Sequence, residues 1–169
     1  MHKEIPPNIS VDSFLNGKLK IYQSKDAFKS GSDAVFLSAF VNCQSGQVLE
    51  AGCGTGVVSL CLAARCPEIH ITGIDIERSV ISMAQDSAAC NNLSTQCQFI
   101  CSNISDMPHA NHMYNAVVTN PPYFSTTPSP NPKVAKAKNQ SMSLRVWIKE
   151  STKQLKSKGY LYLIYPTEK

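Results

Sequence analysis

The segment Asn120-Pro121-Pro122-Tyr123 follows an apolar run that favours a β-strand, and its residue types could do chemistry. Proline lacks a backbone donor, so the two prolines end the strand rigidly. The side-chain oxygen of Asn120 and the carbonyl of Pro121 could each accept an N–H hydrogen bond from a planar amine. The amine lone pair would then point at an electrophile for in-line attack, while Tyr123 and Phe124 stack on the flat face. These residues form a candidate catalytic site for methyl transfer to an exocyclic or amide nitrogen, and Asn120 is also a candidate contact of the cofactor that donates the methyl group.

A glycine-rich segment, Gly52-x-Gly54-x-Gly56, lies at a predicted strand-to-helix turn. Glycine allows positive φ and close approach of a ligand, and the start of a helix offers free N–H groups. A dinucleotide-binding turn would read GxGxxG, whereas here the bulky Val57 follows the third glycine. Together with Glu50 before it, this spacing favours S-adenosylmethionine (SAM) over NAD as the cofactor. A tight turn that binds nothing is the alternative.

Asp75 ends the next predicted strand. An acid at this position after a glycine turn can accept hydrogen bonds from both ribose hydroxyls of a nucleoside cofactor. The alternative is that Asp75 caps the helix expected to begin at about Glu77. Because the glycine turn precedes it, we favour the ribose-binding role.

The apolar patterning predicts an α/β fold with a Rossmann-like, doubly wound, mainly parallel sheet. Residues 19–41 are expected to begin with a short hairpin or loop, which is followed by a helix capped by Ser32 or Asp33. The next helix is expected to bury a stripe that includes Ala64, and the last a stripe that includes Leu155. The expected strands are 47–51, 70–75, 96–102, 114–120 and 160–166, and the expected later helices are 57–64, 77–91 and 142–156. The candidate site residues then fall at the carboxyl edge of the sheet, where such folds bind ligands.

Length and composition indicate one globular domain of 169 residues, with 43% hydrophobic and 17% charged residues. No apolar run is long enough for a membrane helix, and the N-terminus lacks the apolar region of a signal peptide. The seven cysteines form no CxxC pair, so we expect buried, reduced thiols in the cytoplasm and no metal site. We expect no membrane partner and favour a monomer.

The positive charge is concentrated after the Asn-Pro-Pro-Tyr segment. Residues 124–158 carry eight basic side chains and one acid, a net charge of +7 in a chain whose total is +4. A solvated helix face would be one explanation, but the placement favours a polyanionic partner such as nucleic acid. Residues 124–140, rich in Pro, Ser and Lys, are expected to form a mobile loop that orders on substrate binding, and its candidate phosphate contacts are Lys133, Lys136 and Lys138.

On these residues the chain resembles the class I SAM-dependent methyltransferases that act on exocyclic or amide nitrogens. The segment "YQSKDAFKSGSDAVFLSAF" is similar to the one preceding the glycine loop in bacterial adenine-N6 methyltransferases that modify valine tRNA beside the anticodon. This resemblance implies that residues 1–45 close over SAM, with Gln23, the pair Phe28-Lys29 and Asp33 taking part. It also implies that residues 46–169 form the SAM-binding core and that tRNA is the substrate.

The chain departs from this family in three respects. Where the family has an acid that meets the adenine amino group of SAM, this sequence offers Asn103, whose amide oxygen accepts more weakly. The loop after the motif carries lysines where relatives have arginines, so phosphate contacts lack the bidentate fork. The family sheet has seven strands in the order 3-2-1-4-5-7-6, whereas only five are expected here. Either the chain is a fragment that lacks the last two strands, or something else covers the fifth strand.

The leading hypothesis is therefore methyl transfer from SAM to the exocyclic N6 of an adenine in tRNA. A protein glutamine N5-methyltransferase of release factors would use the same motif, but it carries an N-terminal helical domain for which the lead-in leaves no room. A DNA or rRNA base methyltransferase remains open. So does a non-catalytic SAM- or RNA-binding fragment.

Overall fold

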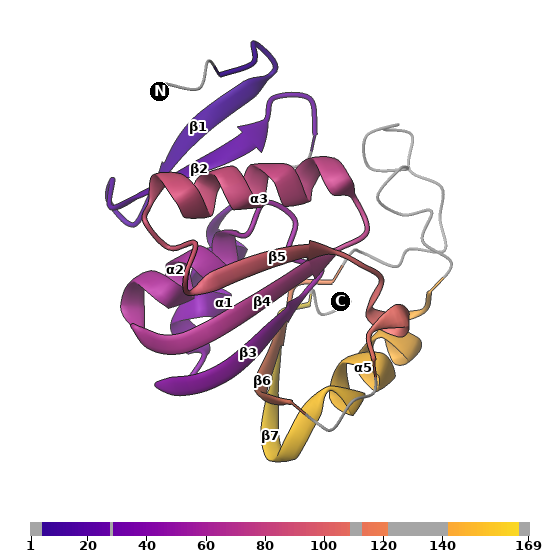
Figure 1. Cartoon of the computed structure of the whole chain (residues 1–169). Coiled ribbons are helices and arrows are strands. Elements are labelled where there is room, and N and C mark those ends of the chain that lie inside the picture. Colours follow the sequence, from indigo (N-terminus) through magenta and orange to yellow (C-terminus); the bar gives the residue numbers. More distant parts are fainter. Residues whose placement is uncertain (1–4, 28, 109–112, 122–141, 166–169) are drawn as a thin grey trace.

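A five-stranded parallel sheet forms the centre of the protein (Figure 1). The computed structural model describes residues 5–27, 29–108, 113–121 and 142–165. The strand order is β5-β4-β3-β6-β7, and each neighbouring pair is parallel. The first strand of this sheet lies in the middle and later strands extend it to both sides, which confirms the doubly wound α/β prediction. The strands are β3 (Ser45–Ala51), β4 (Glu68–Asp75), β5 (Cys97–Cys101), β6 (Tyr114–Thr119) and β7 (Leu155–Leu163).

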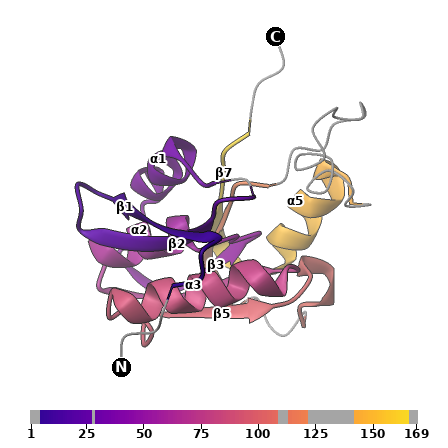
Figure 2. The ribbon, with the colours of Figure 1, turned by 90° about the horizontal axis from the view of Figure 1, so that it is seen from above.

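Helices cover both faces of the sheet (Figure 2). On one face lie α1 (Ser32–Phe40), α2 (Val57–Arg65) and α3 (Arg78–Cys90), and on the other lie α5 (Leu144–Lys153) and the 3-10 helix η1 (Ile104–Asp106). Successive residues of β3 therefore enter different cores: Val48 packs with the cluster of α1 to α3, and Leu49 with the cluster of Trp147. Burial on both faces explains why the central strands read as continuous apolar runs.

An antiparallel hairpin precedes the sheet, formed by β1 (Ile9–Phe14) and β2 (Leu19–Ser24). It lies over α3, and side chains at the end of that helix accept from its backbone: the Lys20 N–H donates to Asn91 Oδ1 at 3.0 Å and the Tyr22 N–H to Ser87 Oγ at 2.9 Å. These bonds satisfy backbone donors that an open strand edge would leave to solvent. The hairpin expected within residues 19–41 is placed differently: of the described strands only β2 lies in that segment, and its partner strand β1 precedes it.

Two details of the helix predictions are wrong. The first helix begins after Gly31 without a side-chain cap, so Ser32 and Asp33 are its first helical residues and do not cap it. In α2, Ala64 is exposed, although the predicted apolar stripe included it. Residues 57–63 of α2 are all buried because this helix lies against the sheet and also packs on α1, so its burial does not follow a single stripe.

The boundary between α5 and β7 also differs from the prediction. The helix ends at Lys153, and Leu155 pairs with Tyr114 in the sheet instead of extending the helical stripe. A register shift follows before Ala116 pairs with Tyr160, and Lys158 there has a φ of +64°. Such a bulge inserts extra residues into one strand and interrupts its alternating pattern. The pattern of 160–166 therefore predicted a strand, but the start of β7 at Leu155 was not predicted. In the described part of the chain β7 is an outer strand, as expected.

The seven cysteines are free thiols. Four of them are buried, and burial raises the pKa of Cys61 to about 11 and that of Cys97 to about 12. The thiols of Cys61 and Cys97 therefore stay protonated and pack as small apolar groups. Cys90 and Cys101 are exposed, which the expectation of a purely buried set did not anticipate.

Candidate functional site

Three neighbouring strands end at the same level of the sheet. Ala51 is the register partner of Ile74 in β4 and of Thr119 in β6. The next residue in each chain segment is a predicted site residue: Gly52 after β3, Asp75 at the end of β4, and Asn120 after β6. Parallel strands bring their carboxyl ends to one edge, so the glycine turn, the acid and the amide lie side by side.

The glycine turn is fixed to β4 by two backbone hydrogen bonds. The N–H groups of Gly52 and Cys53 both donate to the carbonyl of Ile74 at 2.9 Å. All three glycines have positive φ, at +71° for Gly52, +52° for Gly54 and +79° for Gly56. The left-handed region strains any residue with a Cβ, so this turn requires its glycines.

The surroundings of the three glycines differ. A Cβ at Gly52 would lie 3.1 Å from the Trp147 ring, and one at Gly56 would lie 2.7 Å from the ring of Phe99. At Gly54, by contrast, a Cβ would meet no atom of the described residues within 4 Å. The first and third glycines therefore serve packing as well as backbone conformation, and Gly54 alone borders open space that a ligand can enter.

The side chain of Asp75, the last residue of β4, is bonded to the glycine turn. Its Oδ2 accepts the Gly54 N–H at 3.0 Å, and its Oδ1 accepts the Glu77 N–H at 3.0 Å. Desolvation by burial raises the pKa of this carboxyl, although the hydrogen bonds from Glu77 and Gly54 lower it. A carboxylate has about four lone-pair sites, so it can still accept two hydroxyl donors. The N-cap of α3 is Glu77, so the alternative that Asp75 caps this helix is wrong. The ribose-binding role of Asp75 stays a prediction.

The carboxylate of Glu50 faces the first turn of α2. The side chain is 3% exposed, and its Oε2 accepts the Ser59 N–H at 2.9 Å as well as the Ser59 hydroxyl. Burial raises its pKa to about 8, against the lowering effect of both Ser59 bonds. The geometry gives Glu50 a role in holding α2 to the end of β3, and direct contact with a cofactor stays a prediction.

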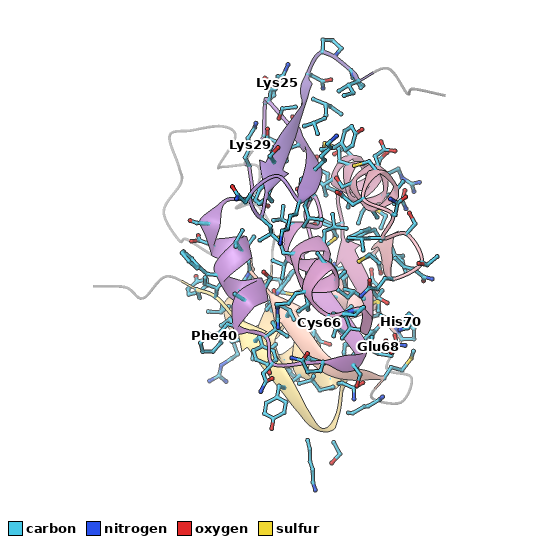
Figure 3. The ribbon with its side chains drawn as sticks, turned by 90° about the vertical axis from the view of Figure 1, so that its left-hand side faces the viewer. Lys25, Lys29, Phe40, Cys66, Glu68 and His70 are labelled. Carbon is cyan, nitrogen blue, oxygen red and sulfur yellow. The ribbon has the colours of Figure 1, made fainter. Side chains whose placement is uncertain are left out.

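Gln23 links the hairpin to the glycine turn. Gln23 is 2% exposed. Its Oε1 accepts the Ser30 N–H at 2.9 Å and also the Thr55 hydroxyl at 3.5 Å. Its amide nitrogen donates to Asp12 at 2.9 Å, and Lys29 forms an ion pair with Asp12 at 2.9 Å. Figure 3 labels Lys29 beside the hairpin. The lead-in is therefore attached to the turn through a buried amide, while cofactor contact by Gln23 remains a prediction.

Two other predicted cofactor residues lie on helices that flank the sheet. Asn103 caps η1, with its side-chain oxygen accepting the Ser105 N–H at 3.1 Å. A second lone pair on that oxygen is left for an adenine amino group. Asp33 is an exposed acid in the first turn of α1. Both cofactor assignments stay predictions.

The structure places only the first half of the candidate catalytic segment. Asn120 is partly buried and Pro121 is buried directly after β6. The remaining predicted residues lie outside the described part of the chain; they are Pro122, Tyr123, Phe124, Lys133, Lys136 and Lys138. Phe28 of the lead-in also lies outside it.

Sequence reasoning missed two residues that support this edge from the face of α5. Trp147 of α5 is buried, and its Nε1–H donates to the hydroxyl of Thr119 at 3.0 Å. Thr119 immediately precedes Asn120, and the Trp147 ring packs against Gly52. The sequence signals that could have found them were that Trp147 is the only tryptophan of the chain and lies in an otherwise largely polar helix.

Within the described residues, no group of three or more His, Cys, Asp or Glu side chains could hold a metal ion. Nor is any helix in that part of the chain long and apolar enough to cross a membrane.

The fold is that of the class I SAM-dependent methyltransferases. A solved SAM-dependent methyltransferase from Agrobacterium tumefaciens superposes with a TM-score of 0.66 over 98% of this chain and 56% of its own, at 18% sequence identity. At that identity the likeness concerns the fold alone.

The chain belongs to the methyltransferase small domain family, whose model matches residues 20–168. It is 32% identical over 155 residues to a Parabacteroides distasonis protein named tRNA1(Val) (adenine(37)-N6)-methyltransferase, and 29% identical over 160 residues to a protein of the same name from a Flavobacteriaceae bacterium. These matches cover 89% and 88% of this chain but 65% and 64% of the two relatives. The family resemblance drawn from the sequence is confirmed.

Proposed function

We propose that this protein transfers a methyl group from SAM to the exocyclic N6 of an adenine in tRNA. The observation that carries this proposal is the alignment of Gly52, Asp75 and Asn120 at the ends of three adjacent strands. That edge combines an open glycine turn, an acid able to accept hydroxyl donors and an amide able to accept an amine. The names of the two relatives supply the adenine and tRNA part of the proposal.

The residues of the turn fit SAM as the cofactor. Open space adjoins Gly54, and the lone pairs left on Asp75 suit the two ribose hydroxyls. When bound, SAM supplies an electrophilic methyl group on a sulfonium. Asn103 would accept from the adenine amino group, and the lead-in with Gln23 and Asp33 would close over the cofactor.

Asn120 and Pro121 orient the acceptor nitrogen. Delocalisation into the ring makes an adenine amine a poor nucleophile, and two N–H hydrogen bonds to the Asn120 oxygen and the Pro121 carbonyl turn its lone pair out of the ring. The nitrogen lone pair would then face the methyl group that a bound SAM would supply, and the sulfur of SAM would keep the electron pair of the methyl–sulfur bond. One N–H proton goes to water afterwards, so no side-chain base is needed before attack. Tyr123 and Phe124 would stack on the base.

The basic segment 124–158 supplies the affinity for tRNA. In its described part Arg145 and Lys149 are exposed on α5, whereas Lys153 is paired with Glu150 at 2.8 Å. Lys133, Lys136 and Lys138 would contact phosphates as point charges. A protein glutamine methyltransferase would use the same amide-and-carbonyl geometry, but neither of the two relatives is named as one.

Incubating the chain with methyl-labelled SAM and separate pools of tRNA, rRNA, DNA and protein tests this function. We expect label in tRNA, on N6-methyladenine after digestion to nucleosides. Label in the protein pool would favour the glutamine alternative. Label in DNA or rRNA would identify that nucleic acid as the substrate in place of tRNA. SAM binding without transfer to any pool would indicate a non-catalytic fragment and contradict the proposal.

A further inference from the structure

The hydroxyl of Thr119 joins the two strands that carry the candidate site. The side chain is completely buried, and its Oγ1–H donates to the carbonyl of Ala51 at 2.8 Å. The same oxygen accepts the Trp147 Nε1–H at 3.0 Å. Ala51 directly precedes Gly52, and Thr119 directly precedes Asn120. One hydroxyl thus connects the residue before the cofactor turn with the residue before the candidate catalytic amide.

The ring of Trp147 supports the same place from α5. The side chain is 6% exposed, and its Cζ2 and Cη2 atoms lie 3.1 and 3.3 Å from the position of a Cβ on Gly52. A Cβ at this distance would be a tight contact, and the ring would have to shift by a few tenths of an ångström to admit it. The turn is therefore held between the Trp147 ring and the carbonyl of Ile74, which accepts the Gly52 N–H at 2.9 Å.

This bridge lies where the backbone ladder between β3 and β6 stops. Ala51 and Thr119 are the last register pair of the two strands. Beyond this pair, the ladder no longer fixes the turn after β3 relative to the segment after β6. The chain of bonds from Trp147 through Thr119 to Ala51 is buried, so breaking it leaves polar groups without partners and is costly.

We infer that Trp147 and Thr119 are a positioning pair, which sets the separation between the cofactor turn at Gly52 and the amine-binding Asn120. This inference rests on the proposed function. Neither side chain is placed against the reactants, so both act through the residues next to them. In-line transfer is sensitive to displacements of about 1 Å, and the loss from such a displacement reaches about 100-fold in rate.

The test compares Thr119→Val, which keeps the side-chain shape but removes the hydroxyl, with Thr119→Ser, which keeps the hydroxyl. Trp147→Phe removes the N–H donor while leaving a ring against Gly52. We expect Thr119→Val and Trp147→Phe to lower kcat by about 10- to 100-fold. The Kd for SAM should change less than about threefold, and Thr119→Ser should retain most of the wild-type kcat. The double variant should lose little more than either single variant, because the two residues act as one unit.

Trp147 also provides a readout that does not depend on turnover, because it is the only tryptophan of the chain. Titration with S-adenosylhomocysteine should change the Trp147 emission of the wild-type protein, with the Kd found by calorimetry. In Thr119→Val the ligand should still bind, but the amplitude of this change should be smaller than in the wild type, since the ring no longer donates a hydrogen bond to the strand ends. Ser38→Ala is the control, because it removes a buried hydroxyl that donates to the Val35 carbonyl within α1.

The outcomes separate this inference from the proposed function. A wild-type chain that binds the cofactor product but transfers no methyl group contradicts the function only, and the emission amplitude then decides the positioning pair. Full kcat and full amplitude in Thr119→Val would overturn the pair. So would a Thr119→Ser variant as impaired as Thr119→Val, or an equal loss in Ser38→Ala. A wild-type chain without cofactor binding would overturn both.

Discussion

The carboxylate of Asp75 accepts the backbone N–H of Gly54 at 3.0 Å, so the acid at the end of β4 directly holds the open glycine of the turn after β3. The other carboxylate oxygen accepts the Glu77 N–H at the start of α3. A single side chain thus fixes the turn and the next helix relative to each other while keeping lone pairs for a ligand.

Asp75→Asn should weaken SAM binding by about 10- to 100-fold, because an amide has one acceptor oxygen and loses charge-assisted bonds to the ribose. Calorimetric titration of SAM measures the change. Glu68→Gln is the control, since Glu68 is an exposed acid at the other end of the same strand (Figure 3). Equal affinity of Asp75→Asn and wild type would exclude the ribose-binding role.

Alanine substitutions at two glycines of the turn should have different effects. Both residues have positive φ, which costs an alanine about 1–2 kcal/mol. In Gly56→Ala the new Cβ would also lie 2.7 Å from the Phe99 ring, so overpacking should remove roughly 1–3 kcal/mol more from the free energy of unfolding.

Gly54→Ala should keep more of the free energy of unfolding but lose SAM affinity, since its Cβ enters the space open to a ligand. Urea unfolding and SAM titration of both variants check this contrast. The assignment of Gly54 as the ligand-facing glycine is wrong if its alanine variant binds SAM as the wild type does.

Glu50 should make the stability of the protein decrease as pH rises. Burial raises the pKa of Glu50 from its ordinary 4.5 to about 8, so the folded protein holds this proton where the unfolded chain releases it. The stabilising contribution is therefore complete below about pH 4.5 and is lost as pH rises to about 8, by up to about 1.4 kcal/mol per pH unit.

Glu50→Gln removes this titration and keeps an oxygen to accept from Ser59. Its free energy of unfolding relative to wild type should therefore increase between about pH 5 and pH 8, measured by urea unfolding at several pH values in that range. Glu77→Gln, at the exposed start of α3, is the control. A difference between Glu50→Gln and wild type that does not change with pH would contradict a buried, protonated Glu50.

Asn120→Ala should lower the rate of methyl transfer at least about 100-fold, which is typical for removal of one transition-state hydrogen-bond partner. Binding of SAM should stay nearly intact, because the described cofactor-binding candidates lie mainly at the ends of β3 and β4. Single-turnover kinetics with tRNA, together with SAM titration, separate the two effects. Near-wild-type turnover would refute the catalytic role of Asn120.

The three lysines of the segment after the motif should set the salt dependence of tRNA binding. Changing Lys133, Lys136 and Lys138 to Gln should weaken binding and flatten the slope of log K against log salt by up to about 0.7–0.9 for each phosphate that is no longer neutralised. The matched control changes the same three residues to Arg, which keeps the charge. An unchanged slope in the Gln variant would identify this segment as a solvated surface.

The five strands of the parallel sheet, the glycine turn and the positions of Asp75 and Asn120 at strand ends could be predicted from the sequence, whereas β1 of the hairpin was not. Alternation, helical periodicity and glycine spacing are local properties that a window of a few residues reveals. The least accurate boundary was that between α5 and β7. There the pairing of Leu155 with Tyr114 and the bulge before Tyr160 depend on β6, which is distant in sequence.

Only the tertiary structure decided what surrounds each site residue. Glu50, Gly52 and Gln23 are predicted ligand contacts, and that role stays a prediction. The structure adds a partner within the protein for each: Glu50 bonds to Ser59, Gly52 receives the ring of Trp147, and Gln23 ties the hairpin to the loop before α1. The contact of Trp147 with Thr119 joins residues 28 positions apart, and no local pattern encodes it. Local patterning determines which residues reach the carboxyl edge, whereas packing between distant elements determines which of them face a ligand and which hold the edge in place.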